Sequence, residues 1–100
     1  MLEEIKKIQG INHSEFDDMI TTWINAAKLD LQSIGIVDTL IQTPNDLIKS
    51  TIIAYVLSQL DVDNAELYSN SYALQKDCLR HYQEYVTEGA NPPTVPVQSA

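Results

Sequence analysis

The strongest constraint on the fold is a long run with helical periodicity at residues 12–34. At 100° per residue its apolar side chains fall within an arc of roughly 140°, and its polar side chains point away. Asn12, with Glu15 three residues later, has the spacing of a capping box, and Gly35 suits a left-handed helix end. The pattern predicts one long amphipathic helix with a single buried face. The residues of that face are Phe16, Met19, Ile20, Trp23, Ile24, Ala27, Leu31 and Ile34.

Two further helices precede and follow this run. Residues 1–9 are predicted to form a short helix that Gly10 ends. Thr43 as the N-cap and Pro44 as the first helical residue predict a helix that runs to residue 60. Its apolar residues surround the helix axis on all sides. We therefore expect part of its surface to meet a neighbouring subunit.

A last helix is predicted over residues 65–87, and one of its sides is assigned to the core. That side is lined by Leu67, Leu74, Cys78, Tyr82 and Tyr85 and is extended by Tyr68, Tyr72, Leu79 and Val86. Residues 36–42 are rich in β-branched side chains, and either an extended loop or a strand-like segment is expected there. The sequence thus predicts an all-α fold, a small bundle of about four helices: a short N-terminal helix, two long helices and a C-terminal helix.

The chain is expected to divide into a helical domain at residues 1–88 and an extended tail at residues 89–100. The tail holds three of the four prolines and no charged residue. Such a segment favours polyproline conformation and cannot form a core by itself. Two interpretations stay open, a disordered tail and a peptide that docks on a partner.

The charge balance excludes several classes of function. Fourteen acidic residues against six Lys and Arg give a net charge of -8, spread along the chain. Gripping nucleic-acid phosphates needs clustered Lys and Arg, so a nucleic-acid-binding surface is not expected. A single cysteine, Cys78, cannot form an internal disulfide, so nothing indicates an oxidising compartment and the cytosol is the default expectation. Neither a signal peptide nor an apolar run of about 18 residues is present, so no membrane partner is expected.

No catalytic, metal or cofactor site is predicted. The segment from Asp61 to Glu66 resembles the opening of a calcium loop, but an EF-hand needs Gly at the sixth position and Glu at the twelfth. Those positions hold Glu66 and Tyr72, which favours a capping turn. His13 and His81 lack a second ligand at helical spacing, and Cys78 lacks a partner base in the sequence.

Two positions break the pattern of the long helix. Asp30 projects close to the apolar arc, whereas Leu29 projects to the polar side. A charge beside an apolar face is usually solvated or paired, and an exposed Leu is common, so a subunit contact is one alternative. The candidates for such a contact, on this helix and on the all-round apolar helix, are Leu29, Asp30, Ile53, Val56 and Leu60.

The order of these features resembles the head-tail connector (adaptor) proteins of long-tailed bacteriophages. The resemblance covers about residues 1–90 and rests on a short leading helix, the segment from Ile11 to Ile20 with Asp17-Asp18, a Pro-started apolar helix with Ala54-Tyr55, and a last helix with a Pro-rich tail. Members of that family commonly have an aromatic-rich end to the third helix. Here that end reads Leu57-Ser58-Gln59-Leu60.

The resemblance implies a structural role in the virion, at the head-tail interface, after synthesis in the host cytoplasm. It implies a ring, often of twelve subunits, that binds the portal protein above and a stopper or tail-completion protein below, while double-stranded DNA passes through without specific binding. It also implies that the tail reaches the portal. The docking candidates in the tail are Pro92, Pro93, Val95, Pro96 and Val97.

A second function class fits the composition. A small acidic regulator, such as an antitoxin-like protein or a DNA mimic, would bind a basic partner through its carboxylates. A mimic needs these acids gathered on one face, whereas the sequence spreads them over several segments. An enzyme is the least expected class.

Overall fold

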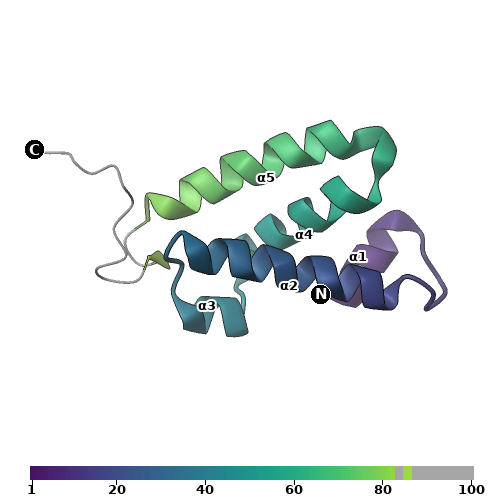
Figure 1. The fold of residues 1–100 in the computed structure, drawn as a ribbon, viewed down its shortest axis with the longest axis horizontal. Helices are drawn as coiled ribbons and strands as arrows, with labels where there is room; N and C mark the ends of the chain where they lie inside the picture. Colours follow the sequence, from purple (N-terminus) through teal and green to yellow (C-terminus); the bar gives the residue numbers. More distant parts are fainter. Residues whose placement is uncertain (83–84, 87–100) are drawn as a thin grey trace, which may run out of the picture.

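The computed structural model describes residues 1–82, 85 and 86. It confirms the predicted all-α class and has one α-helix more than the four expected. Within the described part of the chain, β structure is limited to one antiparallel bridge between Ile36 and Val86. In chain order the elements are α1 (Leu2–Gln9), α2 (Asp17–Ser33), α3 (Asp38–Gln42), α4 (Asp46–Leu60), the 3-10 turn η1 (Val62–Asn64) and α5 (Ala65–Arg80) (Figure 1).

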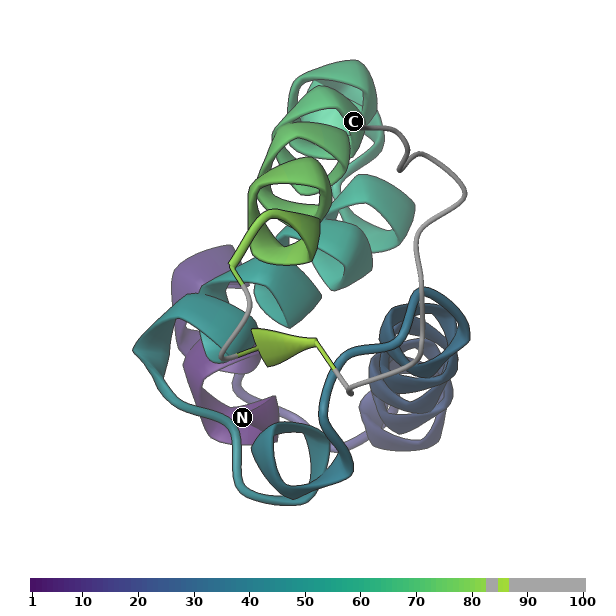
Figure 2. The ribbon, with the colours of Figure 1, turned by 90° about the vertical axis from the view of Figure 1, so that its left-hand side faces the viewer.

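α4 is the central helix of the bundle. It packs against α5, α2 and α1 of the same chain, and Figure 2 shows it between them. This explains why its apolar residues surround the helix axis, because helices of its own chain cover it from several sides. The hydroxyl of the fully buried Thr51 donates to the Leu47 carbonyl at 2.8 Å, so this polar group is satisfied inside the core. The buried residues of α4 are Ile48, Thr51, Ile52, Ala54, Val56 and Leu57.

The predicted N-cap of this central helix is wrong by two residues. Asn45 is the N-cap, and its side-chain oxygen accepts from the backbone N–H of Ile48 at 2.9 Å. Thr43 is used by the preceding helix, because its backbone N–H donates to the Thr39 carbonyl at 3.0 Å. Pro44 therefore lies ahead of the cap rather than inside the first turn of α4.

α2 begins four residues later than the capping-box pattern predicts, with Phe16 rather than Asn12 as its N-cap. The backbone N–H of Glu15, which the Asn12 side chain was expected to bind, instead donates to His13 Nδ1 at 3.3 Å. The His13 ring also packs edge-on against Phe16, with ring centroids 5.3 Å apart, so residues 11–16 form a turn of their own. The other end agrees with the prediction, since Gly35 has a φ of 91°.

Residues 36–42 contain the helix α3 where a loop or a strand-like segment was expected. Only the start is extended: Ile36 pairs with Val86, and the Val37 N–H donates to the Tyr85 carbonyl at 2.8 Å. The Val37 carbonyl then accepts from Leu40 and Ile41, which turns the chain into a helix. This turn places Ile41 in the core at 1% exposure.

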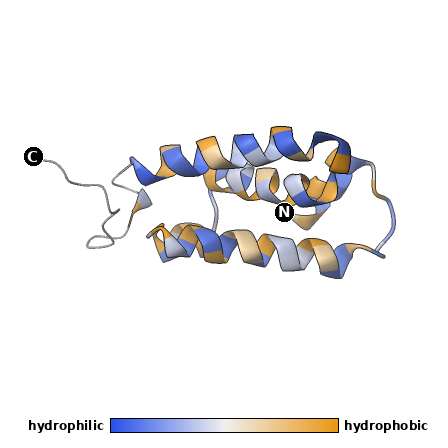
Figure 3. Cartoon of the chain, turned by 45° about the horizontal axis from the view of Figure 1, so that its top comes forward, coloured by the Kyte–Doolittle hydropathy of each residue, from blue (hydrophilic) through white to orange (hydrophobic). Residues whose placement is uncertain are grey.

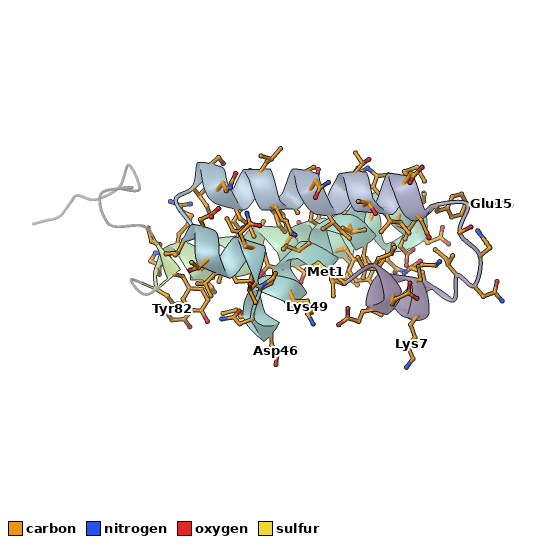
Figure 4. All side chains as sticks on the ribbon, turned by 90° about the horizontal axis from the view of Figure 1, so that it is seen from below. Met1, Lys7, Glu15, Asp46, Lys49 and Tyr82 are labelled. Atoms are coloured by element: carbon orange, nitrogen blue, oxygen red, sulfur yellow. The ribbon has the colours of Figure 1, made fainter. Side chains whose placement is uncertain are left out.

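Ion pairs and hydrogen bonds fix α1 to the other helices. Lys49 Nζ on α4 lies 3.0 Å from Glu4 Oε2, and Figure 4 shows Lys49 close to Met1 at the start of α1. Lys6 Nζ lies 2.9 Å from Asp17 Oδ1 at the start of α2. Gly10 ends α1 with a φ of 70°, as its position after the apolar run predicted.

α5 ends at Arg80, seven residues before the predicted end at residue 87. The amide of Asn45 donates to the Tyr85 hydroxyl at 2.9 Å, so the chain after α5 returns across the start of α4. The predicted extended tail at residues 89–100 lies outside the described residues, and its separation from the helical domain stays a prediction.

Candidate functional site

The apolar side of α5 that was predicted to be buried faces outward. Leu67 and Leu74 are 64% and 69% exposed, and Cys78 and Tyr82 are exposed as well. The side that packs on α4 instead carries Tyr68, Tyr72 and Leu79, of which Leu79 is fully buried. Figure 3 shows hydrophobic positions along the outer side of α5. The assignment of the buried face was therefore right for Tyr68, Tyr72 and Leu79, which extended the predicted side, and wrong for Leu67, Leu74, Cys78 and Tyr82.

Asp30 pairs with two side chains on the inward side of α5. Its Oδ2 accepts from the Tyr72 hydroxyl at 2.5 Å and from Lys76 Nζ at 2.9 Å, and both donors lie on α5. Lys76 Nζ also lies 5.4 Å from the centroid of the Tyr72 ring. We call these three side chains the Asp30 brace. It joins α2 to α5 and accounts for the charge beside the apolar arc of α2.

Burial and hydrogen bonding within the brace shift the pKa values of Asp30 and Tyr72. Burial alone would raise the pKa of Asp30, but the hydrogen bonds from Tyr72 and Lys76 outweigh burial, and the pKa lies below its ordinary value of 3.8. Burial and the hydrogen bond to Asp30 raise the pKa of the Tyr72 hydroxyl. Asp30 is therefore ionised and Tyr72 protonated at neutral pH, which is the state in which the brace forms.

Sequence reasoning missed the brace although it held the signal. A carboxylate close to an apolar arc needs a donor on the facing helix, and Tyr72 with Lys76 at helical i, i+4 spacing offers two. Tyr72 also packs edge-on against Tyr55 of α4, with ring centroids 5.1 Å apart. Matching Asp30 to these donors would have identified the inner side of α5.

The five predicted subunit-contact residues do not form one surface. Leu29 points outward from α2 and is 65% exposed, whereas Asp30 is engaged in the brace. Val56 is fully buried inside the chain, and Ile53 and Leu60 are half-buried against the same core. Their assignment to a subunit contact stays a prediction, and Leu29 is the one whose side chain is most available for it.

Six of the fourteen acidic residues lie at one end of the bundle. The α1–α2 turn meets the turn before α5 there, where Gln9 Nε2 donates to Asp61 Oδ2 at 3.2 Å (Figure 1). Hydrogen bonds from Asn64 and Gln9 lower the pKa of Asp61. Lys6 pairs with one of these carboxylates, that of Asp17, and the others leave an excess of negative charge, which repels phosphates. The six residues are Glu15, Asp17, Asp18, Asp61, Asp63 and Glu66.

The described residues offer no group of three or more His, Cys, Asp or Glu side chains arranged to hold a metal ion. The Asp61 carboxylate accepts hydrogen bonds from the backbone N–H and the side-chain amide of Asn64, as expected for a capping turn. None of the described helices combines the length and hydrophobicity needed to span a lipid bilayer. The five tail residues predicted to dock on a portal, Pro92, Pro93, Val95, Pro96 and Val97, lie outside the described residues.

Comparison with known proteins identifies the family. No curated protein and no solved structure matches the chain. The family described as phage connector protein matches residues 1–87, which include every described helix. This family is structural rather than enzymatic, and its members are components of the virion. Because the match spans most of the 100 residues, the chain belongs to the phage connector protein family.

Proposed function

We propose that this chain is a structural adaptor whose copies form a ring between the portal of a phage head and the next head-completion or tail protein. The match to the phage connector family over residues 1–87 carries this proposal. A ring of twelve copies, as the resemblance implies, forms part of the channel through which double-stranded DNA leaves the head. The role needs neither a cofactor nor a catalytic residue.

The fold supports a subunit that is complete before it assembles. α4 is enclosed by helices of its own chain, so the core needs no neighbour to close it. Assembly is then left to side chains at the surface, and several large apolar ones are exposed there. They are Ile8, Phe16, Met19, Leu29, Val62, Leu67, Leu74 and Tyr82.

The net charge of the subunit supports a channel wall that does not bind the DNA passing through it. Each copy carries a net charge of -8, so a ring of many copies has a strongly negative potential. Such a potential repels the DNA backbone and keeps the duplex from binding the wall. The acidic end formed by the α1–α2 turn and the start of α5 is our candidate for the surface nearest the DNA.

We propose that the tail is the portal contact. Its prolines and valines suit an extended peptide that docks in an apolar groove, and its lack of charge removes repulsion between copies. Such a segment loses conformational entropy when it binds, and this cost reduces its affinity per unit area.

The molar mass of the purified protein tests the ring. Light scattering is expected to give a defined ring, either alone or after addition of a portal ring. A protein that stays monomeric under both conditions would contradict the adaptor role.

A tail variant tests the portal contact separately. Replacement of residues 89–100 by a Gly/Ser segment of the same length is expected to abolish portal binding and to leave the helical content unchanged. The matched control is the single change Gln98→Ala, which keeps the prolines and valines. Undiminished portal binding by the Gly/Ser variant would place the contact elsewhere.

The acidic end keeps the regulator as a second candidate. Six carboxylates at one end approach the arrangement that a DNA mimic needs more closely than the sequence suggested. Two of them are already engaged, Asp17 with Lys6 and Asp61 with Gln9, which reduces their availability to a basic partner. A monomer that ignores portals and captures a basic protein would establish this second role.

A further inference from the structure

Resting on the proposed ring, we infer that its repeating contact joins the outer side of α5 in one copy to the outer side of α2 in the next. We call these surfaces the α5 face and the α2 face. The α5 face consists of Leu67, Asn70, Leu74 and Cys78. The α2 face consists of Met19, Thr22, Asn25 and Leu29. The partner is thus a second copy of this chain.

Exposed leucines belong to both faces. Leu67 and Leu74 are 64% and 69% exposed on α5, and Leu29 is 65% exposed on α2. Small polar side chains surround them, and the hydroxyl of Thr22 donates to the Asp18 carbonyl of its own helix at 2.9 Å. Thr22 can therefore present its methyl group without leaving a donor unpaired in the contact.

The absence of charged residues distinguishes these faces from the rest of the surface. Two copies at -8 each repel, and this repulsion is smallest where both contacting surfaces lack carboxylates. The α5 run at residues 67–75 and the α2 run at residues 19–27 contain no charged residue and hold three of the four residues of each face. The fourth residues, Cys78 and Leu29, lie beside Asp77 and Lys28 at the edges of these runs. A third uncharged run, at residues 50–60, belongs to α4, where most side chains are buried or half-buried against the core of their own chain. Depletion of charge is the compositional mark of the core of a protein interface.

The directions in which the two faces point determine whether the contact forms a ring or a dimer. α5 and α2 lie on different sides of α4, so the faces of one copy point in different directions and do not meet within that copy (Figure 2). A contact between two different faces is head-to-tail, and it continues from copy to copy until the rotation closes a ring. A contact of one face with itself would end at a dimer.

Charge-introducing variants test this arrangement. Leu74→Glu and Leu29→Glu each place a carboxylate in one face at an exposed position, so both variants are expected to fold. Each alone is expected to weaken ring formation at least about tenfold, as loss of a central interface residue does. The control, Ile8→Glu on α1, changes a residue that is 54% exposed and outside both faces, and is expected to form rings as the unchanged protein does.

Mixing the two variants distinguishes a head-to-tail contact from a symmetric one. The Leu29→Glu copy keeps its α5 face and the Leu74→Glu copy keeps its α2 face, so one intact contact forms between them. Native mass spectrometry is expected to show a one-to-one heterodimer and no larger species. Rings formed by either variant alone would overturn the inference while leaving the adaptor role intact, because another surface would then make the contact.

Cross-linking provides a second readout. Cys78 is the only cysteine of the chain and lies in the α5 face, so Asn25→Cys adds one thiol to the α2 face. A bismaleimide is expected to join the subunits of this variant into a covalent ladder of several copies. The control Lys7→Cys, whose side chain projects away from the bundle in Figure 4, is expected to give no ladder. A ladder only in the control would overturn the inference, and absence of any ring in the unchanged protein, alone or on the portal, would overturn the adaptor role as well.

Discussion

α4 and α5 pack against each other, and the comparison between them shows what helical periodicity can and cannot determine. α4 is apolar around its whole axis, and the structure encloses it. α5 has two apolar sides, one with Leu67 and Leu74 and one with Tyr72 and Leu79, and only the second is buried. Periodicity thus identifies a helix that must be covered, but it does not choose between two apolar sides of the same helix.

Truncating one core side chain and one surface side chain is expected to give the largest difference in the free energy of unfolding. Ile52→Ala on α4 is expected to lower the free energy of unfolding by about 2–5 kcal/mol, because Ile52 is fully buried and leaves a cavity. Leu74→Ala on α5 is expected to change it by less than about 0.5 kcal/mol. Urea denaturation, at a concentration where the chain is monomeric, measures both. Equal losses would mean that the outward side of α5 is buried.

Removal of the Asp30 carboxylate tests what orients α5. Asp30→Ala is expected to cost about 1–2 kcal/mol, because the buried Tyr72 hydroxyl and Lys76 lose their acceptor. Tyr72→Phe removes only one hydrogen bond and is expected to cost about 1 kcal/mol. Since both variants break the same bond, their double mutant should cost less than the sum. Full additivity would show that the brace does not act as a unit.

The caps of α4 and α2 provide a matched pair of smaller changes. Asn45→Ala is expected to lower the free energy of unfolding by about 1 kcal/mol, because the Ile48 N–H loses its partner. Asn12→Ala is expected to have no measurable effect, since the structure begins α2 at Asp17. Thermal unfolding of both variants checks this. A larger loss of stability in Asn12→Ala than in Asn45→Ala would support the capping box that the sequence predicted.

Acid titration gives the smallest effect. The folded pKa of Asp30 lies below 3.8, so its share of the stability is present above that value and is lost as pH falls through the folded pKa. The unchanged protein is therefore expected to lose stability more steeply than Asp30→Asn below about pH 4. Unfolding midpoints measured from pH 5 to pH 2 compare the two slopes, and identical slopes would contradict the shift. Asp30 is partly exposed, so the difference is expected to be small.

The sequence was sufficient wherever local chemistry decides the structure. The helix end at Gly10, the left-handed conformation of Gly35 and the burial of Ile20, Ile24 and Leu31 were predicted, because each follows from neighbours in the same helix. Phe16 and Met19 were assigned to the same buried face but are 39% and 42% exposed, so that part of the prediction was wrong. The helical class of the fold follows from the same periodicity.

The sequence was insufficient wherever groups distant in the chain compete. The cap at Asn12 was wrong because His13 binds the same N–H, and α3 forms because the pairing of Val37 with Tyr85 limits the extended segment to its first residues. The end of α5 and its buried side depend on α2 and on the segment around Tyr85, which no local window contains. In each case the sequence does not show which of several possible partners a polar group will bind.

The Asp30 brace has a geometric consequence for the proposed ring. The rotation from one copy to the next is set by the angle between the α5 face and the α2 face, and the brace holds these two helices to each other across α4. A small change in that angle is repeated at every contact around the circle. In the proposed ring this one carboxylate would help to set the curvature of the assembly, and loosening the brace is expected to produce closed circles of several diameters from a single sequence.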